Sequence, residues 1–203
     1  MKTAPLIGIS RHRLATDGEG ITTLIAFHGC ALRCNYCLNS QSLRKEGIWR
    51  HYDTYTLYEE VKKDELYFLA TNGGITFGGG EPYLRSDFIL DFRKLCGPKW
   101  LLTLETSLNV PTKNIEKLLP IVDHYIVDIK DMNDSIYKYY TGTSNKQVIN
   151  NLHYLIKCGK KDVISVRIPL IPLYNNEEDR ERSIQQLKGM GLSRFDLFTY
   201  ITY

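Results

Sequence analysis

The stretch TTLIAFHGCALRCNYC, residues 22–37, sets a β-rich run directly before three closely spaced cysteines. Residues 22–28 are rich in β-branched and apolar side chains, which favours a buried strand. Cys30, Cys34 and Cys37 follow it within eight residues. In barrel enzymes the reacting residues lie where strands end, so this stretch indicates a site built on the loop after a strand.

The spacing of the cysteines is open to more than one interpretation. Three thiolates on one loop can hold three irons of a four-iron cluster and leave the fourth iron free for another molecule. A structural zinc is the alternative, and His28 or His51 could complete a Cys3His set. A redox or disulfide role also fits three neighbouring thiols. The rest of the chain has to decide between these.

Six β-rich runs alternate with amphipathic stretches along the sequence. The expected strands are 22–28, 75–77, 100–105, 124–129, 163–170 and 195–201, and the expected helices are 57–70, 87–96, 112–119, 146–158 and 177–190. The first helix opens with the capping-box pattern Thr56-x-x-Glu59. Such alternation predicts an α/β fold with a parallel sheet, either doubly wound or an incomplete barrel.

Length and composition predict one globular domain over residues 1–203, with 43% hydrophobic and 24% charged residues. We expect Cys96 and Cys158 to be buried as small apolar side chains. No apolar run approaches the roughly 20 residues of a spanning helix and no signal peptide is evident, so the expected location is cytoplasmic without membrane contact. The net charge of +3 comes from residues scattered along the chain, which argues against a nucleic acid partner.

Polar residues follow the later strands at the same end. The second strand runs into the turn Gly78-Gly79-Gly80-Glu81-Pro82, where glycines let a ligand approach the backbone and Glu81 can bind a positive group. Glu105 and Asp128 end neighbouring strands and would repel each other unless a cation lay between them or Lys130 and Arg167 neutralised them. A charged ligand at this face is the simplest resolution.

These motifs together resemble the radical S-adenosylmethionine (SAM) superfamily. The resemblance rests on the motif CxxxCxxC, with an aromatic residue before the last cysteine, and on the later motif GGEP. The segments DGEGITT, GGITFGGGEP, LETS, VDIKDMN and VRIPLIP also occur in the order typical of activating enzymes for glycyl radical enzymes, such as those of pyruvate formate-lyase. The resemblance implies a partial (βα)6 TIM-type barrel with the radical SAM fold.

The resemblance also implies roles for single residues. Cys30, Cys34 and Cys37 would hold a [4Fe-4S] cluster and Asp17 would touch the substrate peptide. The residues expected to contact SAM are Tyr36, Asn39, Gly79, Gly80, Glu81, Glu105, Thr106, Asp128, Lys130 and Arg167. Gly79, Gly80 and Glu81 would receive the methionyl amine, and Tyr36 would lie against the adenine. Glu105, Thr106 and Asp128 match positions that hold a monovalent cation in relatives.

The implied reaction is reductive cleavage of SAM, which yields methionine and a 5'-deoxyadenosyl radical. In activating enzymes this radical removes a hydrogen atom from a backbone glycine of a glycyl radical enzyme. We expect a monomer, with a flavodoxin or ferredoxin as electron donor. Direct modification of a peptide or small molecule is the alternative within the superfamily, and a non-catalytic iron-sulfur or zinc protein is the alternative outside it.

The chain departs from the family pattern at several positions. Glu19 and Thr22 replace the proline and arginine of DGPGIRT, near the expected substrate contact. Leu38 stands where relatives often have histidine, and no histidine follows Tyr200. These differences affect the residues expected to contact the substrate and the adenine of SAM, whereas the cysteines and the GGEP turn match the family pattern.

Overall fold

Eight strands form one open sheet in the computed structural model, which describes residues 2–14 and 16–201. The strands are β1 (Thr3–Leu14), β2 (Ile21–Phe27), β3 (Arg50–Asp53), β4 (Gly74–Gly79), β5 (Leu101–Thr106), β6 (His124–Asp128), β7 (Ile164–Leu170) and β8 (Phe195–Thr199). Their order is β3-β1-β2-β4-β5-β6-β7-β8, and β2 and β4 to β8 run parallel. Since β3 and β8 do not pair, the six parallel strands make a partial barrel, as the sequence predicted.

Two antiparallel strands, β1 and β3, extend the sheet beyond the predicted set. β1 pairs with β2 on one side and with β3 on the other. Pro5, Gly8 and the basic run from Arg11 to Arg13 disfavour a strand by local propensity. Pairing on both sides supplies what local propensity lacks, so β1 is a product of tertiary contacts.

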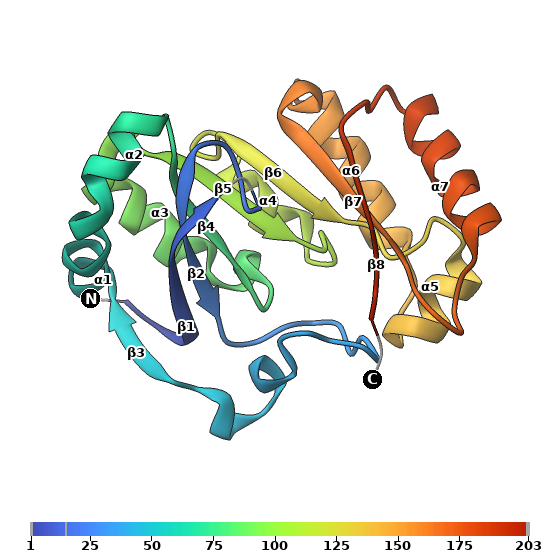
Figure 1. The fold of residues 1–203 in the computed structure, drawn as a ribbon, viewed down its shortest axis with the longest axis horizontal. Helices are drawn as coiled ribbons and strands as arrows, with labels where there is room; N and C mark the ends of the chain where they lie inside the picture. Colours follow the sequence, from blue (N-terminus) through green and yellow to red (C-terminus); the bar gives the residue numbers. More distant parts are fainter. Residues whose placement is uncertain (1, 15, 202–203) are drawn as a thin grey trace.

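Seven α-helices connect the strands in the described part of the chain. They are α1 (Thr54–Val61), α2 (Glu65–Thr71), α3 (Ser86–Cys96), α4 (Thr112–Leu118), α5 (Asp134–Thr141), α6 (Lys146–Lys157) and α7 (Glu177–Gly189). Figure 1 shows α1, α2 and α3 beside the half of the sheet that holds β1 to β4, and α6 and α7 beside β7 and β8. The core fills the space between the helices and the sheet, around Phe27, Phe77 and Trp100.

The helix predicted over 57–70 is two helices separated by a short 3-10 turn at Lys62–Asp64. Asp64 is buried in this turn, where it accepts hydrogen bonds from Arg11 (2.8 Å) and from the Thr23 hydroxyl (2.8 Å). Turning this carboxylate inward interrupts the helix. The predicted capping box was also wrong, because Asp53 caps α1 by accepting from the backbone N–H groups of Tyr55 and Thr56.

Helix α5 was not predicted, although it has clear boundary residues. Asn133 accepts from the Ser135 backbone N–H at its start, and Gly142 ends it with a φ of 81°. The C-terminus of α5 supports the cysteine loop, since the N–H groups of Arg33 and Asn35 donate to the carbonyls of Thr141 and Tyr140 (3.2 Å each).

The two remaining cysteines differ from each other. Cys96 is partly buried against the core, whereas Cys158 is exposed, so its predicted burial was wrong. Cys158 follows the last residue of α6 and lies outside the face that packs on the sheet. None of the described helices is long and apolar enough to cross a membrane.

Candidate functional site

The turn after β4 is joined directly to the cysteine loop. The Gly80 N–H donates to the Phe27 carbonyl (2.8 Å), and the Glu81 N–H donates to the Gly29 carbonyl (2.8 Å). A Cβ at Gly80 would lie 2.2 Å from the Gly29 oxygen, so only glycine permits this approach. The predicted residue Asn39 completes the junction by donating to the Gly79 carbonyl (3.1 Å).

The three predicted thiols line one cavity of about 120 Å³ at the carboxyl ends of the strands. Its other lining residues are Leu32, Leu38, Asn39, Gly79, Gly80, Glu81, Glu105, Thr106, Ser107, Asp128, Lys130 and Tyr200. The structure therefore brings together residues that the sequence scatters over about 170 positions. Burial raises the pKa of Cys30 to about 11 and that of Cys34 to about 12. Both thiols must lose a proton before they can bind metal.

The donor set fits an iron-sulfur cluster. Among residues 2–14 and 16–201, no three histidine, cysteine or acidic side chains converge as they would around a single metal ion. A zinc ion draws thiolates to about 2.3 Å from one centre. Each cysteine of an iron-sulfur cube binds a different iron, and three cysteines that line one cavity can supply these ligands. The Leu32 N–H also donates to the Cys30 sulfur (3.4 Å).

Glu81 is almost fully buried, at 1% exposure, and its carboxylate is fully hydrogen-bonded. One oxygen accepts from the Thr106 hydroxyl (2.7 Å) and the Tyr83 N–H (3.3 Å). The other accepts from the Ser107 hydroxyl (2.7 Å) and N–H (3.1 Å). These four bonds occupy the roughly four acceptor positions of a carboxylate. Burial raises the pKa of Glu81, while the donors act in the opposite direction.

A row of charged residues crosses β6, β7 and β8. Asp128 pairs with Arg167 in the sheet register, and Arg167 pairs with Asp196. The Arg167 guanidinium contacts Glu105 (2.9 Å) and Asp196 (3.1 Å), and it donates to the Thr16 carbonyl. Burial lowers the pKa of Arg167, but these carboxylates outweigh it and the net shift is upward.

Lys130 neutralises the second of the two predicted strand-end carboxylates. Its ammonium donates to Asp128 (2.5 Å) and to the Tyr200 hydroxyl (3.0 Å). Two outcomes were open for Glu105 and Asp128, and the structure has the one in which Arg167 and Lys130 balance their charges. Asp128 keeps one buried oxygen, Oδ1, without a hydrogen-bond partner among the described residues.

A second cavity of about 430 Å³ adjoins the first and continues toward β8. Glu105, Asp128, Leu38 and Tyr200 line both, and Arg167 lines the second. The combined space reaches from the thiols to the charged row, so one extended ligand can contact both.

Asp17 lies on the loop between β1 and β2 and is buried inside the barrel. Arg13 donates to its carboxylate, and Arg167 lies 3.7 Å away. Its carbonyl accepts from the Thr76 hydroxyl. The structure thus ties this loop to β4 and β7 through the residue that was predicted to touch a substrate.

Tyr36 lies apart from the other predicted SAM contacts. It packs edge-on against Tyr174, with ring centroids 5.6 Å apart, and it is not among the lining residues of either cavity. Leu38, given no role from the sequence, lines both cavities instead. Ser107 was also missed, although its place directly after the strand-end pair Glu105-Thr106 was a usable signal.

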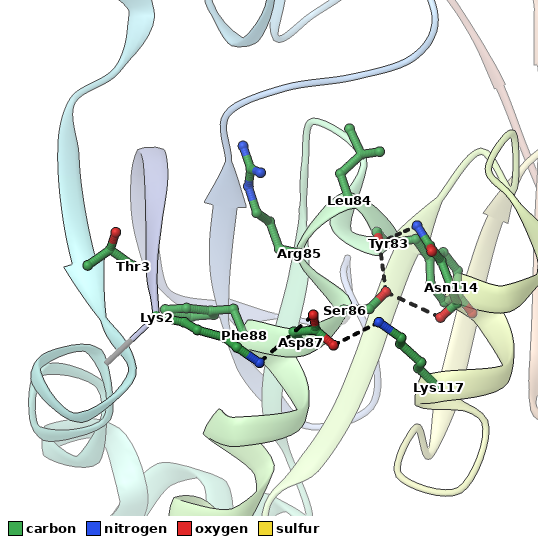
Figure 2. A pocket seen from close by; sticks show the side chains of 10 residues that line it. All are labelled: Lys2, Thr3, Tyr83, Leu84, Arg85, Ser86, Asp87, Phe88, Asn114 and Lys117. Carbon is green, nitrogen blue, oxygen red and sulfur yellow. Dashed lines mark hydrogen bonds and ion pairs between the residues drawn. The ribbon is translucent and has the colours of Figure 1, made fainter.

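Another hollow, of about 250 Å³, lies outside the barrel at the start of α3 (Figure 2). Its polar groups are largely paired with each other, since Asp87 contacts Lys117 (2.9 Å) and Lys2 (3.8 Å). The Ser86 hydroxyl donates to the Tyr83 carbonyl (2.6 Å). This pairing is typical of a helix start held by its neighbours.

Comparison with known proteins assigns the family. The model of the "Radical SAM superfamily" matches residues 24–187, which include the cysteines, the GGEP turn and the charged row up to β7. The chain belongs to the radical SAM superfamily. This finding confirms the resemblance drawn from the sequence. Radical SAM proteins use SAM and a [4Fe-4S] cluster, and the thiol set of this chain fits that group.

Curated relatives place this radical SAM chain among activating enzymes. The (2S)-3-sulfopropanediol dehydratase activating enzyme of Klebsiella oxytoca is 36% identical, covering 79% of this chain and 69% of that protein. The pyruvate formate-lyase 1-activating enzyme of Escherichia coli K12 is 29% identical, covering 91% and 76%. The radical SAM chain is therefore an enzyme of the activating type, as predicted.

Solved structures share the radical SAM fold at lower identity. SuiB of Streptococcus suis bound to S-adenosylmethionine superposes with a TM-score of 0.66 at 15% identity. The match covers 89% of this chain and 42% of SuiB, so this chain spans less than half of that protein. The likeness confirms the partial barrel.

Proposed function

We propose that this protein activates a glycyl radical enzyme. Within one radical SAM domain over residues 1–203, it would cleave SAM at a [4Fe-4S] cluster held by Cys30, Cys34 and Cys37. When bound, the cluster supplies the electron that converts SAM into methionine and a 5'-deoxyadenosyl radical. The observation that carries the proposal is the shared cavity, in which the three thiols face the GGEP turn and the strand-end charges.

Glu81 would act on SAM without a direct hydrogen bond, by fixing the shape of the turn and by its electrostatic attraction for the amine. Because its four acceptor positions are taken, the methionyl amine would bind the glycine carbonyls of the turn instead. Glu81 has no cationic partner among its hydrogen bonds, so its charge still attracts a positive amine. Its bonds to Thr106 and Ser107 hold the turn rigid beside Cys30.

Asp128 and Lys130 would contact the polar parts of SAM. The free Oδ1 of Asp128 suits a ribose hydroxyl or the predicted monovalent cation. Thr106 would contribute less to a cation, because its hydroxyl already donates to Glu81 and accepts from the Leu108 N–H (2.9 Å). Arg167 would orient the carboxylates around the cavity, and Leu38 would cover the ligand from the cysteine loop.

The substrate contact would lie near the loop of Asp17, where the second cavity opens. The sequence similarity to two activating enzymes supports a backbone glycine as the hydrogen donor. A flavodoxin or ferredoxin would supply the electron, and the protein would act as a monomer in the cytoplasm.

The test is anaerobic reconstitution with iron and sulfide, followed by reduction with dithionite in the presence of SAM. We expect 5'-deoxyadenosine and methionine, and a glycyl radical signal in electron paramagnetic resonance once a partner glycyl radical enzyme is added. Cys34→Ala should abolish cleavage, whereas the matched control Cys96→Ala should retain it, because Cys96 lies outside the cavity.

Each possible result has a distinct meaning. Deoxyadenosine without a glycyl radical on any candidate partner would favour direct modification of a peptide or small molecule. Failure of the wild-type protein to cleave SAM would favour a non-catalytic metal protein. Undiminished cleavage by Cys34→Ala would refute the cluster assignment.

A further inference from the structure

The segment that carries the cysteines is basic. Residues 28–50 hold four basic residues, Arg33, Arg44, Lys45 and Arg50, against the single acidic residue Glu46. The other 180 residues hold 22 basic and 22 acidic residues. Residues 1–16 have the same net charge of +3, but there Arg11 and Arg13 are paired with Glu60, Asp64 and Asp17.

The four basic residues of this segment are open to solvent, although Arg33 also donates to the carbonyls of Cys30 (2.9 Å) and Leu32 (3.0 Å). All four residues are exposed, and none forms an ion pair within the described residues. Most other charges on the molecule differ, as in Arg182, which contacts both Glu178 (3.1 Å) and Asp179 (2.6 Å). Unpaired charges of one sign produce a potential that extends from the surface and attracts the opposite sign.

The segment forms a continuous outer face over the carboxyl ends of the strands. Figure 1 shows it running along one edge of the molecule between β2 and β3, away from all the helices except α5. The three cysteines of this segment line the cavity, whereas its four basic residues are exposed and line neither of the two cavities. A protein resting on this face would stand directly over the cysteine loop.

An exposed aromatic residue lies within the basic face. Trp49 is 56% exposed, and its ring lies 6.1 Å from that of Tyr52, which Arg50 covers at 5.2 Å. Tryptophan and arginine are the side chains most enriched at protein interface hot spots. Exposed basic residues and one exposed tryptophan on the same segment fit a transient contact with an acidic protein, and they offer no row of aromatic rings for nucleic acid bases.

We propose that residues 28–50 form the docking face for a small acidic redox protein that delivers the electron to the cysteine loop. The inference rests on the proposed function, because a donor is needed only if the thiols hold a reducible group. The inference adds to the proposed function the surface on which the donor docks and the negative charge of that donor. The basic side chains would raise the rate of encounter, and Trp49 would supply apolar contact.

Binding to the apoprotein tests the face without any cluster chemistry. The probe is an oxidised acidic flavodoxin, titrated by calorimetry at low and at high salt. We expect binding that weakens with salt, and a loss of tenfold or more in affinity or association rate in Arg44→Glu/Lys45→Glu. The matched control is Lys157→Glu/Lys161→Glu, which reverses two exposed lysines at the opposite end of the barrel. Equal losses in both variants would overturn the proposal.

Reduction of the reconstituted protein separates docking from catalysis. Dithionite needs no docking face, so Arg44→Glu/Lys45→Glu should cleave SAM at the wild-type yield with dithionite and about tenfold more slowly with reduced flavodoxin. The same rate with flavodoxin would overturn the docking face. Normal reduction by flavodoxin with slow activation of a glycyl radical enzyme would assign the face to the substrate instead. If the wild type does not cleave SAM even with dithionite, the proposed function is refuted, while binding of flavodoxin to the apoprotein still tests the docking face.

Discussion

The carboxylate of Glu81, in the turn after β4, is held by neutral donors, whereas the carboxylates of Glu105 on β5 and Asp128 on β6 are held by cations. Glu81 accepts four bonds from Thr106, Ser107 and Tyr83. Asp128 and Glu105 instead pair with Lys130 and Arg167. Glu81 has no cation among its hydrogen-bond partners, whereas Glu105, Asp128 and Asp196 share the two cations Lys130 and Arg167. The walls of one cavity are thus built for different ligand groups.

Replacing Arg167 by methionine should have the largest effect on stability. The change removes the cation shared by the partly buried Glu105, by the exposed Asp196 and by Asp17, which keeps its contact with Arg13. Breaking one partner of a buried ion pair costs about 3 kcal/mol of the free energy of unfolding, measured by urea titration. The control is Arg182→Met, whose ion pairs are exposed and should cost less than about 1 kcal/mol. Equal losses of stability in the two variants would show that water screens the charged residues around Arg167.

Thr106→Val tests the neutral donors around Glu81 with a change that keeps the shape of the side chain. The variant removes the donor to Glu81 and the acceptor for the Leu108 N–H. We expect a loss of about 2 kcal/mol in the free energy of unfolding, because two buried polar groups lose a partner. Thr103→Val on the same strand is the control, since the Thr103 hydroxyl forms none of the side-chain bonds around Glu81. A loss no larger than that of the control would mean that Glu81 is held by the remaining donors.

Ser107→Ala should have a smaller effect on the same carboxylate. The hydroxyl bond at 2.7 Å is lost, but the Ser107 N–H continues to donate to the same oxygen. The expected cost is about 1 kcal/mol by urea titration. In a double-mutant cycle, Ser107→Ala and Thr106→Val should couple, because they share one acceptor. Strict additivity would contradict a single network around Glu81.

The pH dependence of stability should show the smallest effect. Burial raises the pKa of Glu105, although Arg167 acts in the opposite direction. A raised folded-state pKa contributes stability that is fully present below the ordinary value of 4.5 and is lost as pH rises through the raised pKa. Glu105→Gln does not titrate, so the stability of the wild type relative to this variant should increase as the pH falls toward the ordinary value of 4.5. A difference that stays constant would place Glu105 in contact with water.

Much of the candidate site could be predicted because its residues end strands. The six parallel strands follow from local β-rich runs, and parallel strands deliver their carboxyl ends to one face. The thiols, Glu105, Asp128 and Lys130 therefore lie around one cavity, as the one-sided pattern indicated. Tyr36 did not follow this rule, because it lies within the cysteine loop and not at a strand end.

The pairing of the charged groups could not be predicted in the same way. Whether Glu105 meets Arg167 depends on the order and curvature of β5 to β8, which no local pattern specifies. The strand β1 and the helix α5 were missed for a related reason. Each is stabilised by partners distant in the sequence, and α5 in turn supports the cysteine loop.

The sequence by itself determined the family, the six parallel strands and the types of side chain at their ends, because these depend on local motifs and on strand periodicity. The tertiary structure alone decided that Glu81 is saturated by Thr106 and Ser107, and that cations balance Glu105 and Asp128. It also showed that the basic residues of the segment that carries the cysteines are exposed. Burial and contact across strands set the partners of a charge, and both arise only when distant segments meet.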